Sequence, residues 1–211
     1  MEMPASNSMS ASVESPTIIG ARCPRCASQN HAGGKFCGEC GTRLLPRCER
    51  QEVSVLIVDV CGFTAMSERL DPEDVREIMD LALGIIEDCV HRHAGTVNQF
   101  LGDGVMALFG VVAGVEEHPR RALSAAHAIQ AGLEPVRELA RDRHGVEFRV
   151  RAGVHTGSVA LGAIGGDVRA DYAAAGPTTS EAARLVNVAR AGEVAVSDYT
   201  KTLVTGSSLP A

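Results

Sequence analysis

Two aspartates in this sequence stand where apolar, strand-like runs end. Asp59 ends the run that begins at Val53, and Asp103 lies in a Gly-Asp-Gly turn between the runs 97–101 and 105–109. Clustered carboxylates repel each other unless cations join them, and Mg²⁺ favours one or two carboxylates together with phosphate oxygens. Two such ions about 4 Å apart can activate a hydroxyl and stabilise a leaving phosphate. The pair therefore predicts phosphoryl or nucleotidyl transfer from a nucleoside triphosphate.

Each aspartate also has a simpler interpretation. Taken alone, Asp103 is favoured as an ordinary turn residue of a hairpin, and Asp59 can be an acid at a strand end. Residues 60–64, directly after Asp59, are predicted to open a helix, and the free backbone N–H groups of a helix start suit a triphosphate. The joint pattern therefore favours the metal and nucleotide site over the two separate interpretations.

Four cysteines near the N-terminus form a second candidate site. Cys23 and Cys26 make one CxxC pair, and Cys37 and Cys40 make another after ten intervening residues. Each CxxC turn points two sulfurs at one metal, so this spacing predicts a four-thiolate zinc site. The segment has almost no core, and the metal must therefore supply its folding energy. Two disulfides or a redox-active CxxC are the alternatives.

The predicted zinc site is closed by its four ligands, which indicates a structural or protein-binding role. Gly38 and Gly41 are expected to provide the permissive backbone that the two turns need. DNA binding by this segment stays an alternative, although it has few basic residues and no interleaved aromatic ones.

The composition describes a globular domain with a small additional module. The 211 residues are 45% hydrophobic but only 3% aromatic, so the core must consist mainly of Val, Leu, Ile and Ala. Residues 1–50 carry six Lys/Arg against four Asp/Glu, and the remainder carries 14 against 22. This acidic main domain argues against nucleic-acid or membrane-surface binding. Residues 1–17 lack an apolar signal core and no apolar run approaches the ~18 residues of a membrane span, so we expect a cytoplasmic protein.

The chain divides by composition into four segments. Residues 1–21 are rich in Ser, Ala and Pro and are predicted to be a disordered tail. Residues 22–45, which carry the four cysteines, resemble a zinc ribbon of the kind found at the start of many bacterial signalling proteins. Residues 46–51 are a predicted linker, and residues 52–211 are the main domain. Hydrophobic periodicity in the main domain predicts an α+β fold, with an antiparallel or mixed sheet and helices on one face.

The elements that must position the aspartates follow from this periodicity. In chain order we first expect a strand over 53–59, a helix over 72–93 and a hairpin of 96–101 with 105–109. A helix over 116–143, which Pro135 kinks or divides, is followed by strands over 146–154, 158–164 and 170–175, with a turn at 155–157. The last elements are a helix over 178–189, a strand over 194–196 and a helical turn capped by Ser197.

Four motifs in the main domain resemble the catalytic domain of class III nucleotide cyclases, in the family's order and spacing. They are Val-Asp59-Val-Cys-Gly-Phe-Thr64, Phe-Leu-Gly-Asp103-Gly-Val-Met-Ala-Leu-Phe-Gly110, Arg-Ala-Gly-Val-His-Thr-Gly157 and Glu-Ala-Ala-Arg184-Leu. The resemblance covers residues 51–205. It implies a ferredoxin-like core that works as a head-to-tail dimer, in which the ribose 3′-OH attacks the α-phosphate and pyrophosphate leaves.

The resemblance also assigns roles to individual residues. Asp59 and Asp103, with the backbone carbonyl of Val60, match the ligands of two Mg²⁺ or Mn²⁺ ions. Arg184 matches an arginine that stabilises the reacting phosphate from the other chain of the dimer, although it can also be a helix-surface arginine. The predicted catalytic set is Asp59, Asp103, Arg184 and Ser180, and the predicted nucleotide-binding set is Val60, Gly62, Phe63, Thr64, Gln99, Gly102 and Ala173.

Several positions depart from the family pattern. Gln99 stands where adenylate cyclases of this family have a lysine that reads adenine, and Ala173 stands at its Asp or Thr partner. Ser180 replaces an asparagine, and Pro177 replaces an acid. The chain also stops at Ala211, whereas the family's domain usually continues with further strands, one carrying a lysine that contacts the triphosphate. A glutamine can still read a purine edge, but an alanine cannot assist it.

Three hypotheses therefore remain after the sequence alone. The first is an active cyclase that makes a 3′,5′-cyclic nucleotide, cAMP being favoured, as a homodimer. The second is a catalytically weak or inactive cyclase-like module that binds a nucleotide or a partner, or forms half of a heterodimer. The third is an adaptor whose zinc ribbon carries the function. Because many family members carry large C-terminal modules, the sequence is also compatible with a fragment of a longer protein.

Overall fold

The structure is a computed structural model that describes residues 19–23, 25–31, 36–42, 49–111, 117–163 and 172–206. The chain divides into two compact units, residues 1–46 and residues 47–211, which we describe separately. Most of the predicted disordered tail, residues 1–18, lies outside the described residues.

The first unit contains two short antiparallel strands beside the cysteine turns. Strand β1 (Ile19–Arg22) pairs with β2 (Gln29–His31), and Arg22 lies opposite Gln29. The first CxxC turn, which begins at Cys23, therefore connects the two strands.

The second unit is built on a six-stranded sheet in the order β4-β5-β3-β6-β7, with β8 parallel to β6. All other pairs in this sheet are antiparallel, so the predicted mixed sheet is confirmed. The strands are β3 (Glu49–Val60), β4 (Gly95–Leu101), β5 (Gly104–Phe109), β6 (Val150–Ala163), β7 (Tyr172–Ala175) and β8 (Val194–Val196). Because β3 begins at Glu49, the strand includes the last residues of the predicted 46–51 linker.

Strand β6 corrects one prediction. The sequence predicts strands over 146–154 and 158–164 with a turn at 155–157, but residues 150–163 form one strand that pairs with β3 over its first twelve residues. Gly157, the basis of the predicted turn, serves another purpose. A Cβ there would lie 2.7 Å from the Oγ1 atom of Thr178, so the glycine makes room for the helix that packs on the strand.

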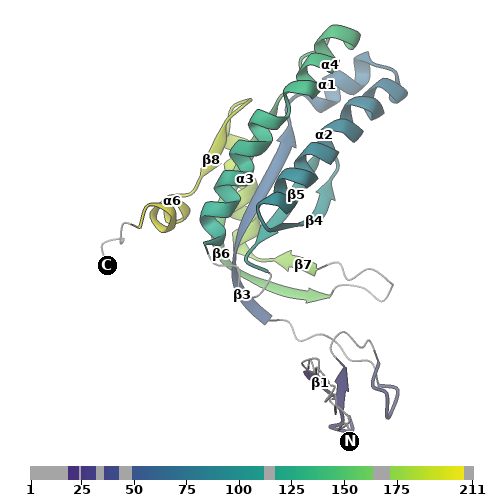
Figure 1. Cartoon of the computed structure of the whole chain (residues 1–211), viewed down its shortest axis with the longest axis vertical. Coiled ribbons are helices and arrows are strands. Elements are labelled where there is room, and N and C mark those ends of the chain that lie inside the picture. The colour runs from purple at the N-terminus through teal and green to yellow at the C-terminus, as the bar shows by residue number, and fades with distance from the viewer. Residues whose placement is uncertain are drawn as a thin grey trace, which may run out of the picture. The chain divides into compact units, whose positions relative to one another are not determined.

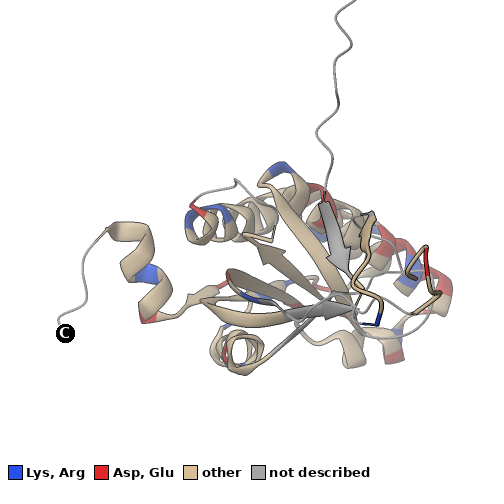
Figure 2. Ribbon diagram, turned by 90° about the horizontal axis from the view of Figure 1, so that it is seen from below, with Lys and Arg blue, Asp and Glu red and all other residues tan. Residues whose placement is uncertain are grey.

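Six helices surround this sheet in the described residues: α1 (Phe63–Arg69), α2 (Pro72–Arg92), α3 (His118–Gly132), α4 (Glu134–His144), α5 (Pro177–Val188) and α6 (Asp198–Thr205). The predicted helix over 116–143 is divided at Leu133, and Pro135 lies in the first turn of α4. Both signs of charge occur along the helices, whereas the central strands carry few charges (Figure 2). None of the helices in the described ranges has the length and apolar character that a membrane span requires.

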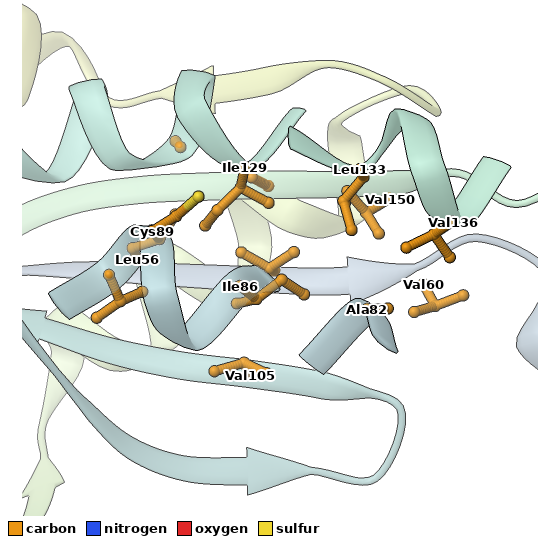
Figure 3. Close-up of a cluster of buried hydrophobic side chains, with 14 of the residues drawn as sticks. Leu56, Val60, Ala82, Ile86, Cys89, Val105, Ile129, Leu133, Val136 and Val150 are labelled. Atoms are coloured by element: carbon orange, nitrogen blue, oxygen red, sulfur yellow. The ribbon is translucent and has the colours of Figure 1, made fainter. Parts of the chain in front are cut away.

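The core lies on both faces of the sheet. Figure 1 shows α2 and α3 side by side over the strands, and Figure 3 shows their side chains meeting those of β3, β5 and β6. Alternate residues of β3 divide between the faces: Leu56, Val58 and Val60 pack with α2, α3 and α4, whereas Val53, Val55 and Ile57 pack with α5. Helix α5 therefore corrects the expectation that helices cover one face only.

A chain of hydrogen bonds between polar side chains fastens α6 and the start of α3 to the sheet. It runs from His118 to Ser54 (3.0 Å), Thr156 (2.7 Å), Thr200 (3.1 Å), Ser197 (2.9 Å) and His155 (2.8 Å). The Ser197 side chain also accepts a hydrogen bond from the Thr200 N–H, which confirms the predicted cap. Burial lowers the pKa of both histidines from the usual imidazole value, which favours the neutral rings in this chain of hydrogen bonds.

Candidate functional site

Asp59 lies next to the end of β3, on the face of the sheet that α5 covers further along. Its neighbour on β6 is Arg151. The Nε atom of Arg151 donates a hydrogen bond to the Asp59 Oδ2 atom at 2.9 Å, and the Nη2 atom lies 2.8 Å from the same oxygen in an ion pair. Both side chains are roughly three-quarters buried. One carboxylate oxygen of Asp59 is therefore held by a guanidinium. Sequence reasoning did not single out Arg151, although it begins the Arg-Ala-Gly-Val-His-Thr-Gly motif and lies on the strand next to β3.

The hairpin that carries Asp103 lies directly beside Asp59. Residues Val58 and Val105 are paired between β3 and β5, and this register places Gly104 next to Asp59. A Cβ at Gly104 would lie 2.8 Å from the Val58 carbonyl oxygen and 3.7 Å from the Asp59 Oδ1 atom. The structure therefore brings the end of β3 and the Gly-Asp-Gly turn together, with the oxygen of Asp59 that Arg151 leaves free facing the hairpin.

The backbone directly after Asp59 is the segment that the sequence predicts to bind phosphate. The Val60 side chain is buried in the core, so only its backbone is available to a ligand. Gly62 has a φ of 72° and forms the N-cap of α1, which starts at Phe63. Thr64 is exposed in the first turn of this helix. The hard carboxylate and carbonyl oxygens grouped here are donors that suit Mg²⁺ or Mn²⁺.

The predicted base-reading residues lie on strands at opposite ends of the sheet order. Gln99 is exposed on β4 opposite Met106, and Ala173 lies on β7 opposite Gly162. The Cα atoms of β4 and β7 nevertheless come within 8 Å of each other. The fold thus brings together the two strands that carry these residues.

Helix α5 carries the remaining predicted catalytic residues. Its inner face packs through Ala182 and Val186 on the sheet, and its outer face exposes Arg184, whose side chain is 79% accessible. The Arg184 guanidinium lies 3.4 Å from the Glu181 carboxylate one turn earlier. Ser180 is also exposed, and its hydroxyl donates to the Gly176 carbonyl at 3.5 Å. These side chains face solvent and are available to a surface other than this chain's own aspartates.

The four predicted zinc ligands gather in the first unit. The Sγ atoms of Cys23 and Cys40 lie 3.5 Å apart, as do those of Cys26 and Cys37, and all four lie within 4.8 Å of one another. Sulfurs around a tetrahedral zinc ion, each about 2.3 Å from the metal, are about 3.8 Å apart. Hydrogen bonds from the Ser28 hydroxyl and from backbone N–H groups lower the pKa of Cys37 to about 5, whereas the pKa of the contacting Cys26 thiol is raised to about 11. Of these two thiols, Cys37 is therefore the one favoured as the thiolate that zinc binds. The cluster therefore fits zinc.

The two cysteine turns share one backbone conformation. Ala27 follows the first pair with a φ of 58°, and Gly41 follows the second with a φ of 67°. Gly41 therefore has the predicted role. Gly38 does not, because its φ is ordinary and a Cβ there would meet nothing within 4 Å. Ala27, which sequence reasoning passed over, occupies the strained position instead.

We expect Ala27→Gly to strengthen zinc binding. An alanine in the left-handed region costs about 1 kcal/mol that glycine avoids, which corresponds to about fivefold in affinity when folding and binding are coupled. Competition for zinc against a chromophoric chelator measures this difference. The matched change Gly41→Ala introduces the same strain at the equivalent position and should weaken binding. Equal affinities in the wild type and both variants would contradict the strain argument.

Comparisons with known proteins agree with this geometry. Residues 46–209 match the family described as the adenylate and guanylate cyclase catalytic domain. Adenylate cyclase 1 of Rhizobium meliloti is 35% identical over 136 residues, which are 64% of this chain and 20% of that protein. An uncharacterised protein of Mycobacterium tuberculosis is 33% identical over 67% of this chain and 25% of its own length. The chain thus spans a fifth to a quarter of the curated relatives that it matches.

Solved structures show the same fold. The guanylyl cyclase Cya2 is 28% identical with a TM-score of 0.70, covering 74% of this chain and 79% of that one. The adenylyl cyclase CyaB from P. aeruginosa is also 28% identical with a TM-score of 0.70, covering 75% and 83%. The chain therefore belongs to the adenylate and guanylate cyclase catalytic domain family.

Proposed function

We propose that residues 52–211 convert ATP, with GTP as the alternative, to a 3′,5′-cyclic nucleotide and pyrophosphate for intracellular signalling. The observation that carries this proposal is the placement of Asp59 against the hairpin that holds Asp103, in a chain of the cyclase family. Similarity to both an adenylyl and a guanylyl cyclase leaves both bases as candidates.

Asp59, Asp103 and the Val60 carbonyl would hold two Mg²⁺ or Mn²⁺ ions. Bound there, the ions would make the ribose 3′-OH more acidic and would neutralise charge on the phosphates. Gly62, Phe63, Thr64 and Gly102 provide backbone close to the phosphates, and Gln99 provides an amide for the purine edge. These are the residues predicted from the sequence, and the grouping of β3, α1 and the β4–β5 hairpin supports them.

A dimer completes the proposed site. Arg184 and Ser180 would act on a nucleotide held by the aspartates of the partner subunit, because both side chains face solvent in the single chain. Phe100 and Leu101, next to the Gly-Asp-Gly turn, are 55% and 41% exposed. Large apolar side chains beside a charged half-site are typical of a surface that a second subunit covers.

A catalytically weak module, alone or as half of a heterodimer, is the second candidate. Ala173 favours it, because β7 approaches β4 but alanine brings no polar atom to help Gln99 read the base. Loss of one positioning contact can reduce the rate by roughly 100-fold. This candidate predicts nucleotide binding with little turnover.

One assay separates the two candidates. The purified protein is incubated at high concentration with ATP or GTP and with Mn²⁺ or Mg²⁺, and cyclic nucleotide is measured by chromatography. We expect product from the wild type and none from Asp59→Ala. Equal product from both proteins would contradict the proposal that the chain is an enzyme. Nucleotide binding measured on the same samples would then favour the regulatory module. Loss of partner capture on Cys23→Ser, with the main domain still folded, would instead point to the adaptor.

A further inference from the structure

A second cluster of metal-binding side chains lies away from both sites described above. It joins the start of α2 to the end of α4 and consists of Asp74, Glu77 and His144. Asp74 and Glu77 are three residues apart and so share one face of α2. One ligand atom from each of the three residues lies within 4.8 Å of the other two.

His144 is the residue that distinguishes this cluster from an ordinary acidic surface. Its side chain is only 9% exposed, and no hydrogen-bond partner for its buried Nε2 atom is found among the residues that the structure describes. That atom faces the Glu77 Oε2 atom at 3.6 Å, and the Nδ1 atom faces the Asp74 Oδ2 atom at 3.5 Å. A buried polar atom without a partner costs free energy, so an imidazole whose unpartnered Nε2 atom faces one carboxylate while a second carboxylate lies beside the ring requires an explanation.

The spacing of these atoms suits a metal ion better than a direct hydrogen bond. Two ligand atoms that are each about 2.0–2.1 Å from a tetrahedral zinc ion lie about 3.3–3.4 Å apart. The observed separation of 3.6 Å between His144 Nε2 and Glu77 Oε2 is close to this value. One imidazole with two carboxylates is a donor set that favours zinc or a similar transition metal over Mg²⁺ or Ca²⁺.

The surroundings support the same interpretation. The Arg143 Nη1 atom donates to the Glu77 Oε1 atom at 2.7 Å, which fixes that carboxylate and leaves Oε2 directed at His144. The Asp74 and Glu77 side chains are 41% and 44% exposed, so an ion can enter from solvent and keep water on its remaining positions.

We propose that Asp74, Glu77 and His144 form a zinc site that clamps the start of α2 to the end of α4. The site is independent of the proposed cyclase chemistry, because none of its ligands belongs to the predicted catalytic or nucleotide-binding set.

Zinc stoichiometry and affinity test this site in the full chain. The measurement uses the Asp59→Ala protein as the background, so that the predicted catalytic metal site does not add zinc. Both proteins are equilibrated with micromolar zinc, and free metal is then removed. We expect the Asp59→Ala protein to keep one zinc ion per chain more than the Asp59→Ala protein that also carries His144→Gln. Isothermal titration should show the second site weakened at least about 10-fold in the variant.

Two further variants keep the result interpretable. Glu77→Gln retains the shape of its side chain and should lose the same zinc ion, whereas His127→Gln, which replaces an exposed histidine on α3, should keep it. Circular dichroism establishes that each variant is folded. Equal zinc content in the background, His144→Gln and Glu77→Gln proteins would overturn the proposal and leave these residues as an ion-pair cluster.

Discussion

Mixing equal amounts of Asp59→Ala and Arg184→Ala proteins should restore cyclase activity that neither variant has alone. If the aspartates act with the arginine of the partner subunit, each homodimer of a variant has two defective sites. A mixed dimer has one site that lacks both groups and one that keeps both. When subunits exchange at random, half of the dimers are mixed. Each mixed dimer has one intact site out of two, so about a quarter of the wild-type activity should return.

The separate variants should each be reduced by at least about 100-fold, since removing one group that stabilises transition-state charge has an effect of that size. Arg76→Ala is the matched control, because Arg76 is an exposed arginine on α2 that forms an ion pair with a carboxylate one turn away, as Arg184 does. Arg76→Ala alone should be fully active. A mixture of the two defective variants that stays inactive would contradict the shared site, and full activity of Arg184→Ala alone would remove that arginine from the mechanism.

Gly153→Ala should strongly destabilise the main domain, although it adds only one methyl group. A Cβ at Gly153 would lie 2.5 Å from the Ala182 carbonyl oxygen and 2.7 Å from the Val186 N atom. Both are backbone atoms of α5 and cannot rotate away, so the helix that carries Arg184 must move. We expect a loss of about 3 kcal/mol in the free energy of unfolding, measured by urea denaturation, together with reduced cyclase activity.

Gly84→Ala is the matched control for this change. Gly84 is an exposed glycine inside α2, and a Cβ there would meet nothing within 4 Å. Alanine should therefore stabilise the helix by about 0.5–1 kcal/mol and leave activity unchanged. Equal urea midpoints for Gly153→Ala and the wild type would show that α5 does not pack on β6 as closely as described.

The sequence is most informative where chemistry and periodicity coincide. The apolar run before Asp59 and the Gly-Asp-Gly turn predict that Asp59 and Asp103 stand where strands end, and the β3–β5 pairing places that turn beside Asp59. The CxxC spacing is sufficient to predict the sulfur cluster. Pro135 correctly predicts the division of the long helix, because proline cannot continue the backbone hydrogen bonds of a preceding turn.

The failures have a common physical cause. Gly157 wrongly predicts a turn, because the sequence around a glycine looks the same whether the glycine allows the chain to bend or allows another element to pack closely. The short distance to Thr178 shows that close packing is the reason here. Arg151 and His144 depend in the same way on contacts with residues far along the chain, Asp59 and Glu77. The strain at Ala27 escapes prediction because alanine carries no local signal for a positive φ.

The ion pair between Arg151 and Asp59 has a consequence for how the proposed site would bind its metal. One oxygen of the Asp59 carboxylate already contacts the Arg151 guanidinium. A metal ion that needs both oxygens must therefore displace this guanidinium. This internal counterion lowers the affinity of the site for a free ion but leaves one oxygen available to a metal that arrives already bound to a triphosphate. For the proposed site we therefore expect a metal–nucleotide complex to bind more readily than a free metal ion.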